Sequence, residues 1–378
     1  MLPRLELLMW RARLPVWPSC CKIVQASRPP TEDRKERRMR ELRKFVAGLS
    51  AVAALVAIVS NGVAAQERPN GLLKAKSWAF QLKNLGPDQQ AKIAASPYDL
   101  VVIDSEQFPE EKEIPLTRAE VERMKIKPDG SRRLVIAYFS VGEAENYRYY
   151  WKPEWNRAKP SWVGKENKQW GGNFLVKYWD PTWQTIVMGG PKSFADQVVN
   201  SGFDGFYIDR VDAYYYYGDS NEKRVQMTDF IIKLANYIRS KKPDSLILAQ
   251  NAEELLEYPN YVKAIDGIAK EDLVYGISHT EKMNPAGDIA HTSKLLSGAK
   301  KAGKAIFVIE YLTKPDFISV AKAKTDELGF VLYVGPRGLA ELYDGTSGAG
   351  PRRGPLDPTP DAPSLKKAPG IKKSSLVQ

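Results

Sequence analysis

The sequence has very little cysteine and histidine. Its 378 residues include two cysteines, Cys20 and Cys21, and two histidines, His279 and His291. Both cysteines fall in a leader that we expect the mature chain to lack, which excludes disulfides, thiolate catalysis and cysteine-ligated metals. Neither an H-E-x-x-H motif nor a credible Ser-His-Asp set involves the histidines. Their scarcity therefore argues against a metalloprotease or a serine hydrolase.

The central part of the chain also lacks net charge, although the whole sequence carries +11. Residues 1–65 hold 12 basic and 5 acidic residues, residues 346–378 hold 6 and 2, and residues 66–345 hold 38 of each sign. A neutral folded part without a basic stripe argues against nucleic-acid binding.

The two ends of the sequence differ in composition from the middle. Residues 39–65 resemble a secretory signal: a basic start, an apolar segment at 45–59 that is short for a membrane span, and small residues before Gln66. We expect translation from Met39, cleavage before Gln66, and a secreted or periplasmic protein with no stable membrane span; an uncleaved anchor is the alternative. Residues 346–378 contain six prolines and two Lys-Lys pairs, which predicts a disordered tail.

Between these ends, short apolar strands alternate with helical patterns, which is typical of βαβ units. We predict eight strands, at residues 77–81, 100–104, 134–140, 205–209, 246–250, 267–271, 305–310 and 330–334, and a clear helix at 225–240. Eight units predict an α/β fold, a single (β/α)8 TIM-barrel domain at residues 72–345. A doubly wound sheet is the alternative, but no G-x-G-x-x-G follows the first strand.

Most of the predicted strands end in Asp, Glu, Gln or Asn. Parallel barrel strands are buried, so a carboxylate at the end of one is costly unless it is paired or exposed at the barrel mouth. The pattern predicts an acid-lined cup at the carboxyl-terminal face, where barrel enzymes keep their active sites. Two carboxylates acting as an acid and a base or nucleophile are what glycoside hydrolysis needs.

One connection, from Ser140 to Gly205, is unusually long and rich in tryptophan. It holds Trp151, Trp155, Trp162, Trp170, Trp179 and Trp183. Such rings offer flat apolar faces for sugars, or they form a satellite core beneath a long loop. Both interpretations stay open, and each can hold for different tryptophans.

The strand motifs taken together resemble the family-114 glycoside hydrolases. They are W-A-F-Q-L at Trp78, V-I-D-S-E at Val102, Y-F-S-V-G-E-A-E at Tyr138, G-F-D-G-F-Y-I-D-R-V-D at Gly202 and K-E-D-L-V-Y-G at Lys270. The resemblance covers most of residues 72–345. It implies a TIM barrel and endo-α-1,4-polygalactosaminidase-like activity on galactosamine-rich polysaccharide.

The resemblance also implies that Asp209 and Glu271 are the catalytic carboxylates. Asp209 is expected to be the nucleophile or base and Glu271 the general acid, with the reverse assignment open. Asp212 is either a substrate contact or a helix N-cap, and Glu143 and Glu145 are alternatively a salt-bridged loop with Arg148. The full set of predicted substrate contacts is Gln81, Asp104, Tyr138, Glu143, Asp212, Gln250, Asn251, Glu310 and Tyr311.

Two functions are therefore weighed. The first is a secreted glycosidase that cuts α-1,4 linkages in an amino-sugar polymer, whose protonated amines would suit an acidic cup. The second is a non-catalytic polysaccharide-binding barrel. Neither a cofactor nor a metal is expected, a Ca²⁺ site at Asp209 and Asp212 being a minor option. The sequence leaves the oligomeric state open.

Overall fold

The computed structural model describes residues 36–37, 39–41, 69–108 and 112–343. The chain divides into two units, Met1–Glu67 and Arg68–Gln378. The described residues of the first unit are helical. The predicted cleavage site and the predicted tail lie outside the described residues. Every helix that the structure describes is too short or too polar to span a bilayer.

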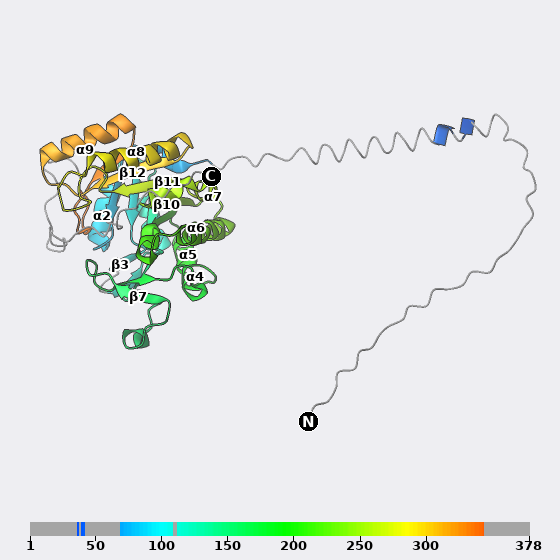
Figure 1. Cartoon of the computed structure of the whole chain (residues 1–378), viewed down its shortest axis with the longest axis horizontal. Helices are drawn as coiled ribbons and strands as arrows, with labels where there is room; N and C mark the ends of the chain where they lie inside the picture. The colour runs from blue at the N-terminus through cyan, green and yellow to red at the C-terminus, as the bar shows by residue number, and fades with distance from the viewer. Residues whose placement is uncertain (1–35, 38, 42–68, 109–111, 344–378) are drawn as a thin grey trace, which may run out of the picture. The chain divides into compact units, whose positions relative to one another are not determined.

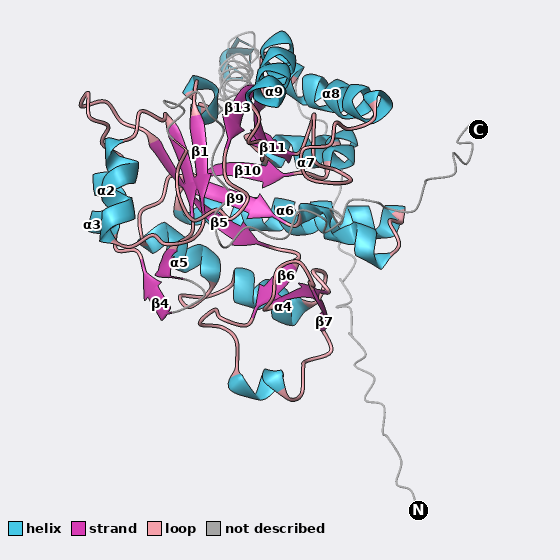
Figure 2. Ribbon diagram, turned by 90° about the vertical axis from the view of Figure 1, so that its left-hand side faces the viewer, coloured by secondary structure: helices cyan, strands magenta, loops and turns pink. Residues whose placement is uncertain are grey.

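The second unit is built on a sheet of eight parallel strands (Figures 1 and 2). Their order in the sheet is their order in the chain: β1 (Trp78–Gln81), β2 (Leu100–Ile103), β5 (Leu134–Ser140), β9 (Gly205–Asp209), β10 (Leu246–Gln250), β11 (Gly267–Glu271), β12 (Ala305–Glu310) and β13 (Val331–Val334). Each strand matches its predicted range to within one residue. A doubly wound sheet would reverse its strand order at a switch point. The uninterrupted order rejects that alternative and confirms the TIM barrel.

Side chains bring the first and last strands together. Trp78 Nε1 of β1 donates a hydrogen bond to the carbonyl of Val331 in β13 at 3.0 Å. The Trp78 ring also lies 5.9 Å from that of Tyr333. The barrel interior is filled by aromatic side chains from alternate positions of several strands, namely Trp78, Phe80, Tyr138, Tyr207, Phe307 and Tyr333.

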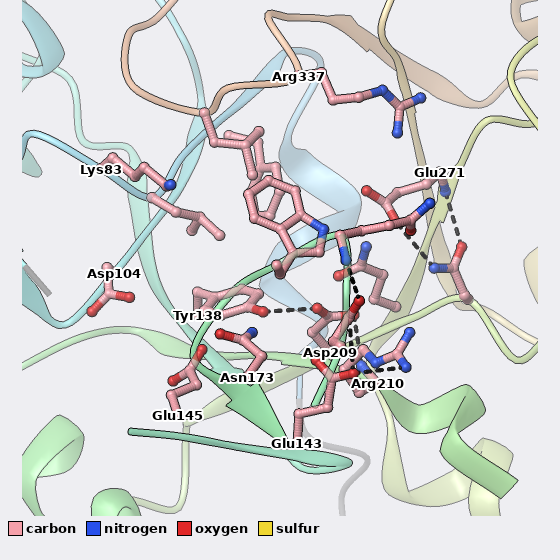
Figure 3. A pocket seen from close by; sticks show the side chains of 18 of the residues that line it. Lys83, Asp104, Tyr138, Glu143, Glu145, Asn173, Asp209, Arg210, Glu271 and Arg337 are labelled. Carbon is pink, nitrogen blue, oxygen red and sulfur yellow. Dashed lines mark hydrogen bonds and ion pairs between the residues drawn. The ribbon is translucent and has the colours of Figure 1, made fainter. Parts of the chain in front are cut away.

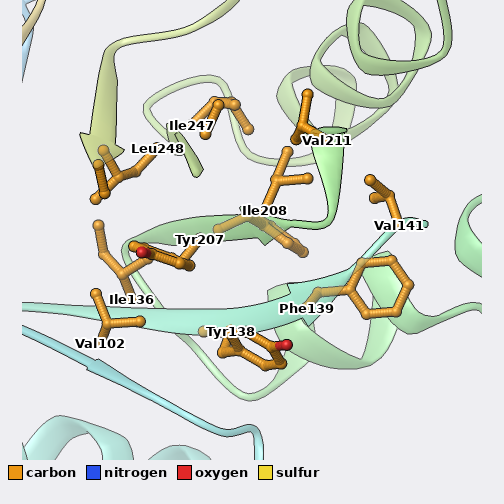
Figure 4. Close-up of a cluster of buried hydrophobic side chains, with 14 of the residues drawn as sticks. Val102, Ile136, Tyr138, Phe139, Val141, Tyr207, Ile208, Val211, Ile247 and Leu248 are labelled. Atoms are coloured by element: carbon orange, nitrogen blue, oxygen red, sulfur yellow. The ribbon is translucent and has the colours of Figure 1, made fainter. Parts of the chain in front are cut away.

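The alternation of side chains along a strand separates this interior from the outer layer (Figure 4). Tyr138 and Tyr207 stack against each other inside the barrel, with ring centroids 6.3 Å apart. Phe139, the next residue along β5, instead stacks on Phe194 of α5 (Phe194–Asn200) at 4.0 Å. A residue at the end of a strand therefore points into the barrel mouth only if it lies an even number of positions from an inward-facing residue of the same strand.

Helices follow most strands and cover the outside of the barrel (Figure 2). The predicted helix at 225–240 lies within α6 (Asn221–Lys241). Ser220 caps α6 by accepting a hydrogen bond from the Lys223 amide, and Arg239 and Lys241 lie in its last turn, where the helix dipole favours cations. The other helices of the second unit are α2 (Pro87–Ala95), α3 (Arg118–Met124), α4 (Pro181–Val187), α5, α7 (Pro259–Ala264), α8 (Ala286–Lys301) and α9 (Pro315–Leu328).

The second unit also contains two small antiparallel sheets outside the barrel sheet. One pairs β3 (Glu106–Phe108) with β4 (Lys112–Pro115). The other lies in the long tryptophan-rich connection and contains β6 (Glu143–Glu145), β7 (Val163–Glu166) and β8 (Asn173–Val176).

Four tryptophans of this connection pack against one another and extend the hydrophobic core of the barrel. Trp151 contacts Trp155, Trp155 contacts Trp162, and Trp162 stacks on Trp183, with ring centroids 5.3–5.5 Å apart. All four rings are buried. These four are therefore core residues, but they join the main hydrophobic core of the barrel and do not form a separate satellite core, whereas Trp170 and Trp179 are only partly buried.

Candidate active site

A pocket opens at the carboxyl ends of the barrel strands (Figure 3). It brings together nine of the eleven predicted site residues: Asp104, Tyr138, Glu143, Asp209, Asp212, Gln250, Asn251, Glu271 and Tyr311. The ends of parallel strands meet at one edge of a barrel, so residues far apart in the sequence share this space.

Asp209 ends β9 and is held by two donors. The Tyr138 hydroxyl donates to its Oδ2 at 2.7 Å, and the backbone amide of Arg210 donates to its Oδ1 at 2.6 Å (Figure 3). Arg210 has a φ of 58°, in the left-handed region that costs a side-chain-bearing residue roughly 1–3 kcal/mol. The chain thus turns sharply directly after the carboxylate.

Glu271 ends β11 and is held in a similar way. The Tyr311 hydroxyl donates to its Oε1 at 2.5 Å, and Asn251 Nδ2 donates to its Oε2 at 3.2 Å. Asn251 also accepts the Glu271 backbone amide at 3.1 Å. Asn251 and Asp272, which follow β10 and β11, have φ values of 54° and 53° and so repeat the sharp turn seen at Arg210.

The two carboxylates interact electrostatically. Burial, together with the negative charge of Glu271, raises the pKa of Asp209 from 3.8 to about 7. Tyr138 and Arg210 oppose this rise because they stabilise the ionised form. Two carboxyls that share one low-dielectric space do not both ionise readily, so the pair loses its last proton only as the pH rises through about 7.

One wall of the pocket contains a buried ion cluster around Arg148. Its guanidinium makes a bidentate pair with Asp104 at 2.7 and 2.6 Å, and its Nε donates to Glu145 at 2.6 Å. Glu106 lies 3.6 Å away. The Glu145–Arg148 salt bridge considered from the sequence is therefore present, and burial still raises the pKa of Glu145.

A second ion cluster surrounds Arg210. Its Nη2 lies 2.9 Å from Glu143 Oε1, and its Nη1 lies 3.8 Å from Asp212 Oδ1. Asp212 is within the first turn of the 3-10 helix Val211–Tyr217, whose N-cap residue is Arg210. The N-cap interpretation of Asp212 is therefore wrong.

Two predicted substrate contacts, Gln81 and Glu310, do not line the pocket. Both are fully buried. Gln81 donates to the carbonyls of Lys83 and Ala340. Glu310 accepts the amides of Val274 and Tyr275, and burial raises its pKa to about 8. Both lie at outward-facing positions of their strands. Their side chains therefore do not face the barrel mouth and instead hydrogen-bond to the backbone of loops.

The pocket also contains residues that sequence reasoning did not assign to it. Arg337 pairs with Asp272 at 2.9 Å and lies 4.2 Å from the Tyr311 ring. Lys83 and Trp170 also line the pocket and contact each other. All come from loops, and the one available signal was for Trp170, which belongs to the tryptophan-rich connection. Among the residues that the structure describes, no group of three or more His, Cys, Asp or Glu is arranged to hold a metal ion.

The model of glycoside-hydrolase family GH114 matches residues 60–348 of this chain. The chain belongs to family GH114. It is therefore a glycoside hydrolase with a carbohydrate substrate, as the resemblance of the strand motifs implied.

Relatives of this GH114 chain include proteins from two other organisms, both of which are described as uncharacterised. One from Methanocaldococcus jannaschii is 37% identical over 278 residues, which cover 68% of this chain and 74% of that protein. One from Deinococcus radiodurans is 33% identical over 274 residues, covering 72% and 83% respectively.

Two solved structures have a similar fold. The glycoside hydrolase domain of PelA from Pseudomonas aeruginosa has a TM-score of 0.51 at 19% identity, with 69% of this chain and 94% of that chain covered. Aspergillus fumigatus Ega3, in complex with galactosamine, has a TM-score of 0.50 at 20% identity, with 72% and 94% covered. At these identities the comparison shows a shared fold.

Proposed function

We propose that this GH114 chain is a secreted hydrolase that cleaves α-1,4 linkages in galactosamine-containing polysaccharide, with Asp209 and Glu271 as its catalytic carboxylates. One observation carries the proposal. The two carboxylates end β9 and β11, the strands on either side of β10. They line one pocket, and each accepts a hydrogen bond from a tyrosine hydroxyl.

The proposed chemistry needs one protonated and one ionised carboxyl. Glu271 gives its proton to the leaving oxygen of the glycosidic bond in the state in which the shared proton lies on Glu271. Asp209 acts either as a nucleophile that attacks the anomeric carbon of the sugar or as a base that activates the attacking water. Its hydrogen bonds from Tyr138 and from the Arg210 amide favour the ionised form whenever Glu271 carries the shared proton. In the reverse assignment, which the raised pKa of Asp209 favours, Asp209 is the acid and Glu271 the nucleophile or base.

The amino-sugar substrate is supported by the charge of the pocket. Seven carboxylates and four basic side chains line it. The three arginines lie beside Asp104 and Glu145, beside Glu143 and Asp212, and beside Asp272. An acidic excess remains, and it attracts protonated amines in a partly desolvated pocket. Ega3, which shares the fold, has been solved with galactosamine. Secretion is proposed from the signal-like residues 39–65.

The experiment that tests this function is incubation of the protein with partly deacetylated α-1,4-linked galactosamine polymer. We expect new reducing ends to accumulate with time, and co-sedimentation with the polymer gives an independent measure of binding. Binding without new reducing ends on this or any related amino-sugar polymer would favour the alternative, a polysaccharide-binding barrel.

The substitution Tyr138→Phe tests the coupling of the carboxylates. The wild-type activity should fall as the pH rises through about 7, because the pair then loses its remaining proton. Without the Tyr138 hydroxyl the ionised Asp209 loses a stabilising donor, so the pKa of the pair rises and this fall moves to higher pH. The measurement is kcat/KM as a function of pH.

Tyr258→Phe, which removes a hydroxyl bonded to Asn221 away from the pocket, is the control and should leave the profile unchanged. An unshifted profile in Tyr138→Phe would contradict the proposed coupling.

A further inference from the structure

Lys83 reaches into the pocket from the loop that follows β1 (Figure 3). Its backbone is fixed on both sides: its amide donates to the carbonyl of Leu339 at 3.0 Å, and its carbonyl accepts from Gln81 Nε2 at 3.0 Å. The flexible part is the side chain. The Lys83 ammonium lies 5.3 Å from the centre of the Trp170 ring, within the range of a cation–π interaction.

Trp170 comes from a different part of the chain, the turn between β7 and β8. Its amide donates to the carbonyl of Asn167, and its own carbonyl accepts from Asn173, both at 3.2 Å. Asn167 in turn donates to Glu143 Oε1 at 3.1 Å. The Trp170 ring is thus built into the pocket wall next to one of its acidic clusters.

Trp170 differs from the other tryptophans that the structure describes. It is the one among them that lines the pocket. Trp155 and Trp179 also carry a lysine over the ring, Lys152 at 5.6 Å and Lys223 at 3.7 Å, but neither ring is part of the pocket lining. Among the tryptophans that the structure describes, Trp170 is thus the one that carries a lysine over its face inside the acid-lined pocket. The two other cations over rings in the pocket are arginines, Arg337 over Tyr311 and Arg148 over Tyr147, and each is held by a carboxylate.

We propose that the face of Trp170 is a binding site for a protonated amine of the substrate, and that Lys83 occupies this site until the sugar displaces it. The inference rests on the proposed function and adds to it a specific recognition element. An aromatic face beside carboxylates is how proteins select an ammonium group over a neutral one. A neutral N-acetyl group would gain no such attraction.

The charges near Trp170 support an amine as the occupant. Glu143 and Glu145 lie on the same wall of the pocket, and each shares its arginine with a second carboxylate. This wall therefore keeps negative charge after its ion pairs are counted. A sugar ammonium that replaced Lys83 would restore the cation–π contact and would carry the rest of the sugar toward Asp209 and Glu271.

Binding rather than turnover gives the cleanest test. The probes are an α-1,4-linked galactosamine tetrasaccharide and its fully N-acetylated counterpart, titrated calorimetrically into the Asp209→Asn protein so that neither is cleaved. In this background, Trp170→Leu should weaken binding of the cationic probe by about threefold to thirtyfold and weaken the neutral probe less. Trp170→Phe keeps an aromatic face and should fall between the two, which guards against a folding defect in the leucine variant.

The lysine gives the matched part of the test. Lys83→Met should tighten binding of the cationic probe, and most of this gain should vanish when Trp170→Leu is also present, because the competition requires the ring. Lys152→Met removes an equivalent cation from Trp155 outside the pocket lining and should leave the affinity for both probes unchanged.

Three results would each overturn the inference: equal losses for both probes in Trp170→Leu, no gain in Lys83→Met, or no binding of the cationic probe at all. Specific binding of the cationic probe without any hydrolysis by the wild type would instead retain the inference and reject the proposed enzyme activity.

Discussion

Asp209→Asn and Glu271→Gln are each expected to lower kcat by about three orders of magnitude, the range that loss of a positioned acid or base produces. Each amide keeps the shape of the side chain and an oxygen that can accept from Tyr138 or Tyr311, so the pocket should persist. What is lost is the ability to carry the shared proton or the negative charge. The measurement is the steady-state rate of reducing-end formation on galactosamine polymer at saturating substrate.

Glu310→Gln is the matched control for these two variants. Glu310 ends β12 just as Glu271 ends β11, but Glu310 is fully buried, faces away from the pocket and accepts backbone amides instead. This variant should keep most of the wild-type kcat. Turnover close to wild type in either Asp209→Asn or Glu271→Gln would reject the assigned carboxylates.

The same Asp209→Asn variant should be more stable than the wild type at alkaline pH. The folded state raises the pKa of Asp209 to about 7, so the stability that this group contributes is full below about pH 4 and is lost as the pH rises through 7. Asparagine carries no charge and suffers no such loss. Thermal unfolding at several pH values should show the variant melting higher at pH 8, with the difference shrinking toward pH 4. A difference that grows toward acid would contradict the raised pKa.

Arg148→Met is expected to destabilise the fold by about 3–5 kcal/mol, because it leaves buried carboxylates without their cation. Arg148 is only 4% exposed and touches both Asp104 and Glu145, which are 2% exposed. The loss corresponds to a fall in melting temperature of roughly 6–20 °C for a domain of this size. The loss should shrink toward acid pH, because burial raises the pKa of Glu145 and its protonation removes a charge that Arg148 neutralises.

Arg132→Met provides the comparison for Arg148→Met. Arg132 makes an ion pair of similar length with Glu122 at 2.9 Å, but both side chains are exposed. Surface pairs of this kind contribute about 0–1 kcal/mol, so the melting temperature should barely change. Similar melting temperatures for the two variants would show that the buried cluster does not hold the pocket wall together.

The barrel could be predicted from the sequence because each strand is a short apolar segment, and most of the strands end in a polar residue. The strand that ends at Asp209 and the strand that ends at Glu271 were placed to the residue. Strand ends meet at the mouth of a barrel whatever the loops do, which is why most of the predicted site residues were brought into one pocket.

Gln81 and Glu310 were predicted to line the pocket because they are polar residues at strand ends. That prediction did not consider whether each position faces into the barrel or away from it. Trp78 and Phe80 face the interior, so Gln81 faces outward; Phe307 faces the interior, so Glu310 also faces outward. The sequence contains this information, because inward- and outward-facing residues alternate along a strand.

The loop residues of the site could not be placed in the same way. Lys83 and Trp170 meet across the pocket although they are far apart in the sequence, and neither belongs to a periodic segment. The Arg148 cluster likewise joins the end of β2 to the loop after β6. Loop positions depend on such long-range contacts, which no local pattern encodes.

The most direct test of the central claim is mass spectrometry of galactosamine polymer after incubation with the wild-type protein and, in parallel, with Asp209→Asn. The account predicts a ladder of oligomers with ordinary hydrolysed ends from the wild type and intact polymer from the variant. Equal ladders from both proteins, or intact polymer from both across the whole range of deacetylation, would contradict it.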